Sequence, residues 1–228
     1  PYYCGAEGNI RSYDTNNPWN IIAENDFIAG GFLWTGTDYI GEAGWPSHGW
    51  PAGLFDICMV EKPRAAFHRA MWNDKPMVRI AVRDNALDID HGRDLWQWPN
   101  MGAIWNFPRA YEGLVIEVNT TTNCERVALF HNGNEMGVRR TADYPNHTIT
   151  WCLPYRRGTL VAKGINGTDT VAVHEIRTAG DAVRLKTTAD RGKLMADGQD
   201  LSYVQVELLD KDGTLVQHAD RRVKASIE

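Results

Sequence analysis

Three residues stand out for their types and spacing, Trp34, Asp38 and Glu42. The flat indole of a tryptophan can stack on the apolar face of a sugar ring. Two neighbouring carboxylates can act as the acid and the nucleophile of a hydrolytic reaction, and the four-residue spacing could bring Asp38 and Glu42 near each other. Loop carboxylates more commonly cap helices or pair with basic side chains, and a loop gives no reason for the separation that catalysis needs. Catalysis by this pair is therefore the less favoured hypothesis.

A second group of aromatic residues could line a sugar subsite or form a flat binding platform. Its members are Trp45, His48, Trp50, Trp96, Trp98 and Trp105. Packing between modules is the interpretation that we favour for most of them, because large aromatic side chains dominate the burial of apolar surface.

The cysteines and the short motifs give no sign of a metal or a cofactor. Cys4, Cys58, Cys124 and Cys152 are scattered, without a C-x-x-C pair or a histidine at ligand spacing. We expect buried free thiols. A Cys124–Cys152 bridge is the alternative, if the two lie on neighbouring strands in an oxidising compartment. No nucleotide-binding loop, H-E-x-x-H or EF-hand pattern occurs, so no cofactor and no metal are implied.

The composition excludes several classes of protein. Hydrophobic residues make up 43% and charged residues 23% of the 228 residues, which is typical of a globular chain. The net charge of -5 and the lack of a basic block argue against nucleic acid as a partner. No apolar run is long enough to cross a bilayer. The first residue is Pro1, so we expect processing, cloning or truncation to have set the start.

The N-terminal third predicts two helices and one strand. Residues 17–25 begin with Asn17 as a cap and Pro18 in the first turn, which is typical of a helix. Phe27–Trp34 is a nearly continuous apolar run, as in a strand that is buried on both faces of a parallel sheet. Residues 61–72 combine an early proline with apolar side chains at helical spacing.

After residue 76 the hydrophobic period changes to two. Three turn pairs, Asn132-Gly133, Asn166-Gly167 and Asp212-Gly213, each join alternating segments and predict hairpins. Strands at this spacing favour a β-sandwich, and a break near Thr178–Gly180 predicts a boundary. We expect modules at residues 1–75, 76–178 and 179–228. The last module is short for a sandwich, which needs about 100 residues, so we expect it to be partial.

The motif order of residues 26–72 resembles the end of the catalytic barrel of glycoside hydrolase family 2 β-galactosidases. The segments DFIAGGFLWTGTDYIGE, WP and GLFDICMVEKPRAAFHRAMW carry the resemblance. The matching positions are Trp34, Thr35, Gly36, Asp38, Tyr39, Gly41, Glu42, Gly53, Asp56, Lys62 and Trp72. The downstream segments LFHNGNEMG, LPYRRGTLVAKG, IRTAGDAVRL and LSYVQVELLDKDGTLV are similar to the two β-sandwich domains that follow that barrel.

The resemblance implies a mixed but predominantly β fold, with the end of a partial (β/α)8 barrel followed by immunoglobulin-like β-sandwich domains. It implies retaining hydrolysis of β-galactosides or related glycans by two Glu residues on earlier barrel strands. Neither Glu can be placed in this chain, and Glu7 stays unassigned. The resemblance implies that Trp34 lies at the rim of the active face, where it and Asp38 would bind substrate.

The resemblance also bears on partners and location. It implies a carbohydrate partner and favours a secreted or periplasmic protein. Because a lone strand and the apolar FIAGGFLW segment should seek a partner, we expect either missing upstream barrel chain or self-association. The alternative function is that of a non-catalytic carbohydrate-binding or structural β-sandwich module, with Trp96, Trp98 and Trp105 as a stacking surface.

Overall fold

The computed structural model describes residues 18–42, 45, 48–83, 101–144, 147–217 and 219–226. Within these ranges the chain is predominantly β, as the sequence predicts, and the named strands all pair antiparallel. The helices of the described residues are α1 (Pro18–Glu24), α2 (Pro63–Trp72) and the short 3-10 turns η2 (Arg109–Tyr111) and η3 (Thr141–Asp143). None of the described helices is both long and apolar enough to span a membrane.

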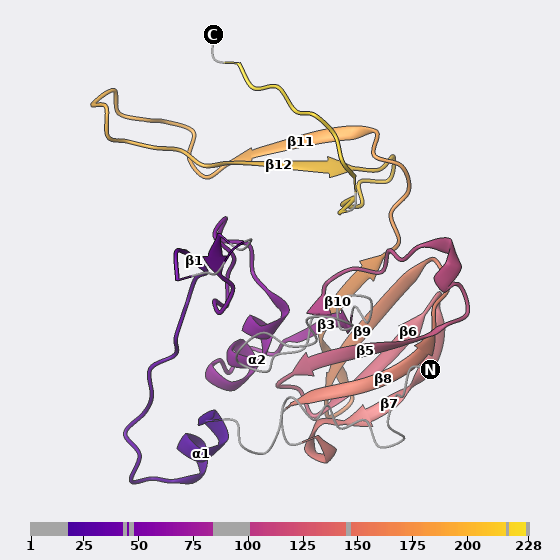
Figure 1. Ribbon diagram of the computed structural model, residues 1–228. Helices are drawn as coiled ribbons and strands as arrows, with labels where there is room; N and C mark the ends of the chain where they lie inside the picture. The colour runs from indigo at the N-terminus through magenta and orange to yellow at the C-terminus, as the bar shows by residue number, and fades with distance from the viewer. Residues whose placement is uncertain are drawn as a thin grey trace.

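Two four-stranded sheets face each other in the middle of the chain and form a β-sandwich (Figure 1). One sheet has the order β4 (Met101–Gly102), β3 (Val78–Arg83), β5 (Val115–Thr122), β8 (Thr148–Pro154). The other has the order β10 (Asp169–Arg177), β9 (Thr159–Asn166), β6 (Arg126–His131), β7 (Asn134–Arg140).

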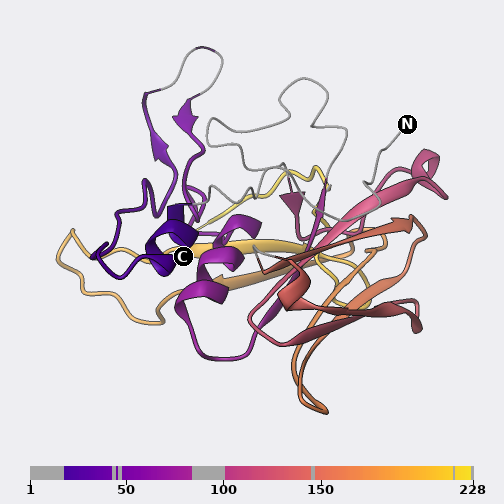
Figure 2. The same cartoon turned by 90° about the horizontal axis from the view of Figure 1, so that it is seen from below.

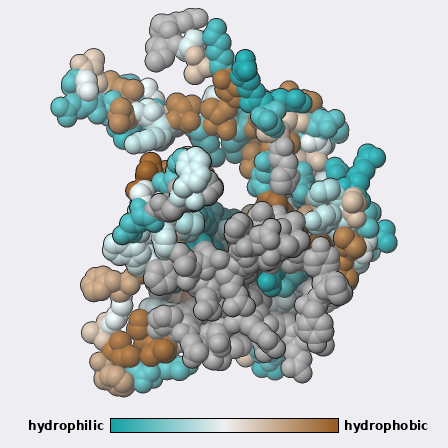
Figure 3. Space-filling model, viewed as in Figure 1, coloured by the Kyte–Doolittle hydropathy of each residue, from teal (hydrophilic) through white to brown (hydrophobic). Residues whose placement is uncertain are grey.

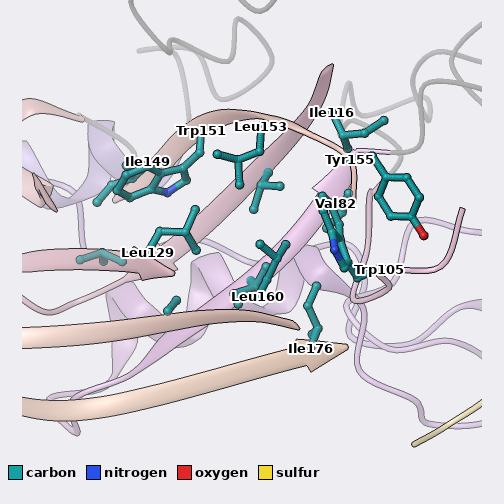
Figure 4. Packing of buried hydrophobic residues seen from close by; sticks show 14 of the residues in the cluster. Val82, Trp105, Ile116, Leu129, Ile149, Trp151, Leu153, Tyr155, Leu160 and Ile176 are labelled. Carbon is teal, nitrogen blue, oxygen red and sulfur yellow. The ribbon is translucent and has the colours of Figure 1, made fainter. Parts of the chain in front are cut away.

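The core lies between these two sheets and follows the period-two pattern of the sequence (Figure 4). Ile116 and Val118 of β5 meet Val127 and Leu129 of β6, because alternate side chains of a strand point to the same face. The core also contains Trp105, which is 0% exposed and donates its indole N–H to the carbonyl of Arg156 at 2.9 Å. Trp105 is therefore a packing residue and not part of an exposed platform.

The predicted turns form with one shift of register. Asn132 and Gly133 have φ values of 51° and 81° and join β6 to β7, as the Asn-Gly pair predicts. In the second hairpin Asn166 pairs with Asp169, so the loop is Gly167–Thr168, one residue later than predicted. The glycine still supplies the positive φ that the turn needs, at 57°.

The N-terminal region contains both predicted helices but not the predicted strand. α1 begins at Pro18, and α2 begins at Pro63 and buries Ala66, Phe67 and Ala70. Residues 28–33 have no strand structure, and their apolar side chains are mostly exposed. A parallel strand is stable only when neighbouring strands satisfy its backbone groups, and no described segment lies beside this one as a strand. The prediction of a strand over Phe27–Trp34 is therefore wrong for this chain.

Two small antiparallel ribbons complete the fold. β1 (Tyr39–Ile40) pairs with β2 (Gly49–Trp50) near the helices. β11 (Arg184–Ala189) pairs with β12 (Val204–Leu209) beyond the sandwich, and Figure 1 shows this ribbon as a long arm. Figure 2 gives the view from below, in which the ribbon passes behind α2. Asp212-Gly213 does make a turn after β12, but the chain returns by a single bridge, between Leu209 and Leu215.

The cysteines differ from the expectation of buried free thiols. Cys124 is free and buried, as expected, whereas Cys58 is free and exposed. Cys152 is disulfide-bonded. Because Cys124 is free, the Cys124–Cys152 bridge does not form. Cys4 lies outside the described residues.

Candidate functional site

Trp34 is exposed and is oriented by its neighbours. Its side chain is 65% exposed, and its indole N–H donates to the hydroxyl oxygen of Tyr39 at 3.3 Å. The two rings meet edge to face, with centroids 6.2 Å apart and an interplanar angle of 87°. The hydrogen bond holds the N–H edge of the indole and leaves much of the side chain exposed to solvent. Stacking on a sugar requires an oriented and accessible ring of this kind.

Tyr39 links Trp34 to Glu42. Its hydroxyl donates to Oε2 of Glu42 at 2.5 Å. This hydrogen bond to Glu42 is the main reason that the pKa of Tyr39 is raised above its ordinary value, so the phenol stays protonated and continues to donate. Glu42 itself has a positive φ of 49°, which places it in the turn after β1.

Asp38 has a different set of partners. Lys62 approaches both carboxylate oxygens at 2.6 Å, and the backbone N–H of Gly53 donates to Oδ1 at 2.7 Å. The side chains of Lys62 and Asp38 are only 20% and 13% exposed, so this ion pair is mostly shielded from water. Lys62 also donates to the carbonyl of Pro51 at 3.0 Å. Asp38 therefore joins residues 34–38, which we call the Trp34 loop, to the start of α2.

Backbone hydrogen bonds hold the same segments together. The N–H of Asp38 donates to the carbonyl of Phe55 at 2.9 Å, and the N–H of Phe55 donates to Gly36 at 3.0 Å. The N–H of Lys62 donates to Leu54 at 2.9 Å. Several of the motif residues thus belong to one hydrogen-bonded unit next to Trp34.

Gly53 is required in this unit by a close approach of the backbone. A Cβ atom at this position would lie 2.2 Å from the backbone nitrogen of Asp38. Asp56 forms the adjacent turn by accepting the N–H groups of Cys58 and Val60, each at 2.8 Å.

The two loop carboxylates have different partners. Asp38 is paired with Lys62, and Glu42 accepts from Tyr39. These separate partners match the structural role that loop carboxylates commonly have, and they do not support Asp38 and Glu42 as a catalytic pair. The roles of Tyr39 and Lys62 were not foreseen, although both positions belong to the motif and could have been found from it.

The remaining predicted residues are spread over several environments. Trp45 is exposed and meets the ring of His48 edge to face, with centroids 6.2 Å apart, whereas Trp50 is half-buried in β2. Trp96, Trp98 and Glu7 lie outside the described residues. Within the described ranges, no cluster of three or more His, Cys, Asp or Glu side chains could hold a metal ion.

Comparison with known proteins assigns the chain to a family. Residues 185–228 match the Glycoside hydrolase family 2 C-terminal domain 5. A β-galactosidase of Bacteroides ovatus is 32% identical over 212 residues, which cover 91% of this chain and 22% of the relative. The chain belongs to glycoside hydrolase family 2. Residues 113–172 also match DUF4982, a domain of unknown function, which covers most of the sandwich strands of this family 2 chain.

Solved structures support the fold over most of the chain. A family 2 member from Bacteroides cellulosilyticus has a TM-score of 0.80 and 31% identity, and covers 92% of this chain and 29% of that one. A β-glycosidase from Bacteroides vulgatus has a TM-score of 0.71 and 26% identity, and covers 86% and 22%. The chain spans about a fifth of the length of the curated relatives that it matches.

Proposed function

We propose that this chain is the C-terminal part of a retaining glycoside hydrolase that cleaves terminal β-galactosides or related glycans. The single observation that carries this proposal is the exposed indole of Trp34, oriented by Tyr39 on a loop that is tied to α2 through Asp38 and Lys62. The β-galactosidase of Bacteroides ovatus supports the galactoside, while a provisionally assigned β-glucuronidase of Formosa agariphila, 30% identical over 92% of this chain, keeps a β-glucuronide as the rival substrate.

In this proposal the chain contributes to substrate binding and not to bond cleavage. Trp34 stacks on the sugar, and Asp38 supports the site by holding the loop in place. The acid and the nucleophile come from barrel strands that belong to the rest of the enzyme. We also propose the division into a barrel end at residues 1–75, an immunoglobulin-like sandwich at 76–178 and a partial second one at 179–228.

The exposed apolar residues of the N-terminal region fit an incomplete barrel. Phe27, Phe32 and Leu33 are all exposed large hydrophobic residues on the segment that follows α1. Exposed apolar clusters mark surfaces that bind another protein segment. We propose that the upstream barrel chain covers this segment in the whole enzyme, and that a second copy covers it when that chain is absent.

The test compares this chain with the longer protein that contains the upstream barrel. The chain alone should not hydrolyse a chromogenic β-galactoside, whereas the longer protein should. In the longer protein Trp34→Ala should lower kcat/KM by about 10- to 100-fold, since a stacked aromatic ring contributes on the order of 1.5–3 kcal/mol. Trp72→Ala is the matched control, because Trp72 is a half-exposed tryptophan packed against Trp19.

Two results would contradict the proposal. Hydrolysis by the chain alone that is abolished by Asp38→Asn or Glu42→Gln would make these carboxylates catalytic. Equal losses of kcat/KM in Trp34→Ala and Trp72→Ala would reduce Trp34 to a packing residue.

The rival function, a non-catalytic carbohydrate-binding module, loses part of its support. Its stacking surface would include Trp105, whose ring is in the core and whose N–H is bound to Arg156. The two other members, Trp96 and Trp98, lie outside the described residues. Alanine substitution of these two followed by polysaccharide pull-down tests this function, and unchanged retention counts against it.

A further inference from the structure

Two arginines lie directly opposite each other at one end of the sandwich, far along the chain from Trp34. Arg126 begins β6 and pairs with Arg140 at the end of β7. Directly opposed residues of an antiparallel pair point to the same face, and like charges in such a pair destabilise the sheet. An acidic partner or an anionic ligand between the two guanidinium groups would offset this repulsion.

The described part of the chain provides no acidic partner for either guanidinium. Arg126 donates to the carbonyl oxygen of Gly167, and no ion pair joins Arg126 or Arg140 to a described carboxylate. The nearest acid in the sequence, Glu125, accepts the backbone N–H of Gly167 at 2.8 Å. Both positive charges thus remain available on this end of the molecule.

Both arginines line a hollow of about 610 Å³. This volume falls within the ~300–1,000 Å³ that small-ligand sites occupy. The remaining lining residues are Asn123, Cys124, Glu125, Thr141, Ala142, Tyr144 and His147.

The lining is ordered by its own hydrogen bonds. Thr141 donates its hydroxyl to the carbonyl of Cys124 at 2.5 Å, and the hydroxyl oxygen of Tyr144 accepts from Arg139 at 3.0 Å. The imidazole Nδ1 of His147 is buried and has no hydrogen-bond partner in the described part of the chain. An aromatic ring, an unused imidazole nitrogen and two guanidinium groups surround the same space.

We propose that this hollow binds the anionic group of an acidic carbohydrate, such as the carboxylate of a hexuronate. Guanidinium groups bind planar carboxylates through paired N–H donors, and the same donors fit the oxygens of a sulfate group. The choice of a carbohydrate as the carrier of the anion rests on the proposed function, but the anion site itself does not. The lining residues of the hollow all belong to the sandwich, so this second site shares no residue with the contacts of Trp34.

The test measures the midpoint of thermal unfolding of the full chain with D-glucuronate, D-glucose and inorganic sulfate, at constant ionic strength. Glucuronate at saturating concentration should raise the midpoint by ~2–5 °C, because a ligand that binds only the folded state stabilises it. Glucose should have no effect. Arg140→Gln should abolish the rise without lowering the midpoint of the free protein, since Arg140 is exposed and has no described partner to lose.

Matched variants and a second measurement keep the outcome interpretable. Lys211→Gln removes one exposed positive charge at a distance from the hollow and should keep the full glucuronate response. Shifts of the Tyr144 and His147 NMR signals on titration with glucuronate should locate the binding.

An equal response to glucose, or an unchanged response in Arg140→Gln, would overturn the proposal. A response to sulfate without one to glucuronate would overturn the carbohydrate assignment. Hydrolysis plays no part in this test, so its result is independent of the Trp34 experiment.

Discussion

The Asp38 carboxylate is held by an ammonium and an amide at the same time, and both contacts are mostly shielded from water. Removing one member of a shielded ion pair leaves the other charge without compensation, which costs more than the pair itself contributes. The contact between Lys62 and Asp38 thereby keeps the Trp34 loop against α2. The observed partners of Asp38 are those of a side chain that holds the loop in place.

Lys62→Met should loosen the loop. The backbone N–H of Asp38, which donates to Phe55, should exchange with solvent at least tenfold faster, as expected for a local loss of about 1.5–3 kcal/mol. Hydrogen exchange at this amide is the measurement. Lys75→Met, at an exposed lysine after α2, should leave the exchange rate unchanged. An unchanged rate in Lys62→Met would show that backbone pairing alone holds the loop.

At the scale of the elements, side chains connect the two sheets along both open sides of the sandwich. On one side, Nδ1 of His174 on β10 accepts the backbone N–H of Ile80 on β3 at 3.1 Å. On the other side, Arg139 of β7 donates to the carbonyl of Thr150 and lies over the ring of Trp151, 4.6 Å from its centroid. These contacts satisfy edge groups that would otherwise face solvent or a foreign strand.

The histidine contact predicts a pH dependence of stability. Burial, and secondarily the charge of Arg79, lowers the pKa of His174 to about 4, and burial lowers the pKa of His68 to about 4. Because an unfolded histidine titrates near 6.5, the unfolded state binds the extra protons between pH 6.5 and pH 4. The free energy of unfolding should therefore be highest above pH 6.5 and fall as the pH drops through this window, by ~1–2 kcal/mol for each histidine after solvent screening.

Urea unfolding at pH 7, 5.5 and 4.5 measures this dependence. His174→Asn should remove part of the fall, because its Oδ1 can accept the Ile80 N–H without titrating. The rest should remain, because burial also lowers the pKa of His68 and of His147. His48→Asn is the control at an exposed histidine and should keep the full fall. The same pH profile in His174→Asn and in the wild type would contradict the assignment.

The junction between the sandwich and the terminal ribbon is also a defined element. The Thr178 hydroxyl donates to the carbonyl of Trp105 at 2.6 Å, and the Ala179 N–H donates to the side chain of Asn106 at 2.7 Å. On the ribbon side, Oδ2 of Asp210 accepts the N–H of Gly180 at 2.9 Å. The predicted boundary is therefore a closely hydrogen-bonded joint.

Asp210→Asn should weaken this joint. The Oδ1 of Asp210 accepts the N–H groups of Asp212 and Thr214, at 2.9 and 2.8 Å. An asparagine that keeps these two bonds turns its NH2 group toward the N–H of Gly180. Because an NH2 group cannot accept a hydrogen bond, the bond from Gly180 is lost. Hydrogen exchange of the Gly180 amide should become at least tenfold faster, while β11 and β12 stay protected. Asp212→Asn, which alters an exposed carboxylate paired with Lys211, is the matched control. Unchanged exchange at Gly180 would show that Asp210 serves the turn alone.

At the scale of the whole molecule, the ribbon presents one apolar and one polar face. Leu185 pairs with Leu208, and Thr187, two residues later on the same strand, pairs with Val206. Since alternate residues of a strand share a face, Leu185 and Val206 lie on the same side of the ribbon. Lys186 forms an ion pair with Glu207 on the opposite side. Figure 3 shows the hydrophobic residues of this arm exposed among hydrophilic ones. A two-stranded ribbon with an exposed apolar face is only marginally stable alone.

The isolated chain should therefore self-associate. Sedimentation velocity should show a sedimentation coefficient that rises with concentration, and Leu185→Thr combined with Val206→Thr should reduce this rise. Lys186→Thr, on the opposite face of the same strand, should not. Equal association of the wild type, the double variant and Lys186→Thr would assign the contact to another surface, such as the apolar segment from Phe27 to Leu33.

The sequence predicted the elements whose signals are local. The proline and apolar spacing of α2 and the Asn132-Gly133 turn depend on neighbouring residues, and both formed as expected. The Phe27–Trp34 strand failed because its stability depends on distant strands, which the apolar pattern does not reveal. Likewise Trp34 was identifiable from its motif, but the partners of Asp38 come from a segment 15 and 24 residues later and became visible only in the fold.

The bonded joint at Thr178–Gly180 has a consequence for how the molecule would be cut. A protease needs several residues of chain to unfold into its cleft, and here both flanks of the joint are tied down. The exposed connection from residue 190 to residue 203, with Arg191 and Lys193 at its start, is the easier target for trypsin. Digestion should therefore nick the connection between β11 and β12 before it cuts the joint at Thr178–Gly180.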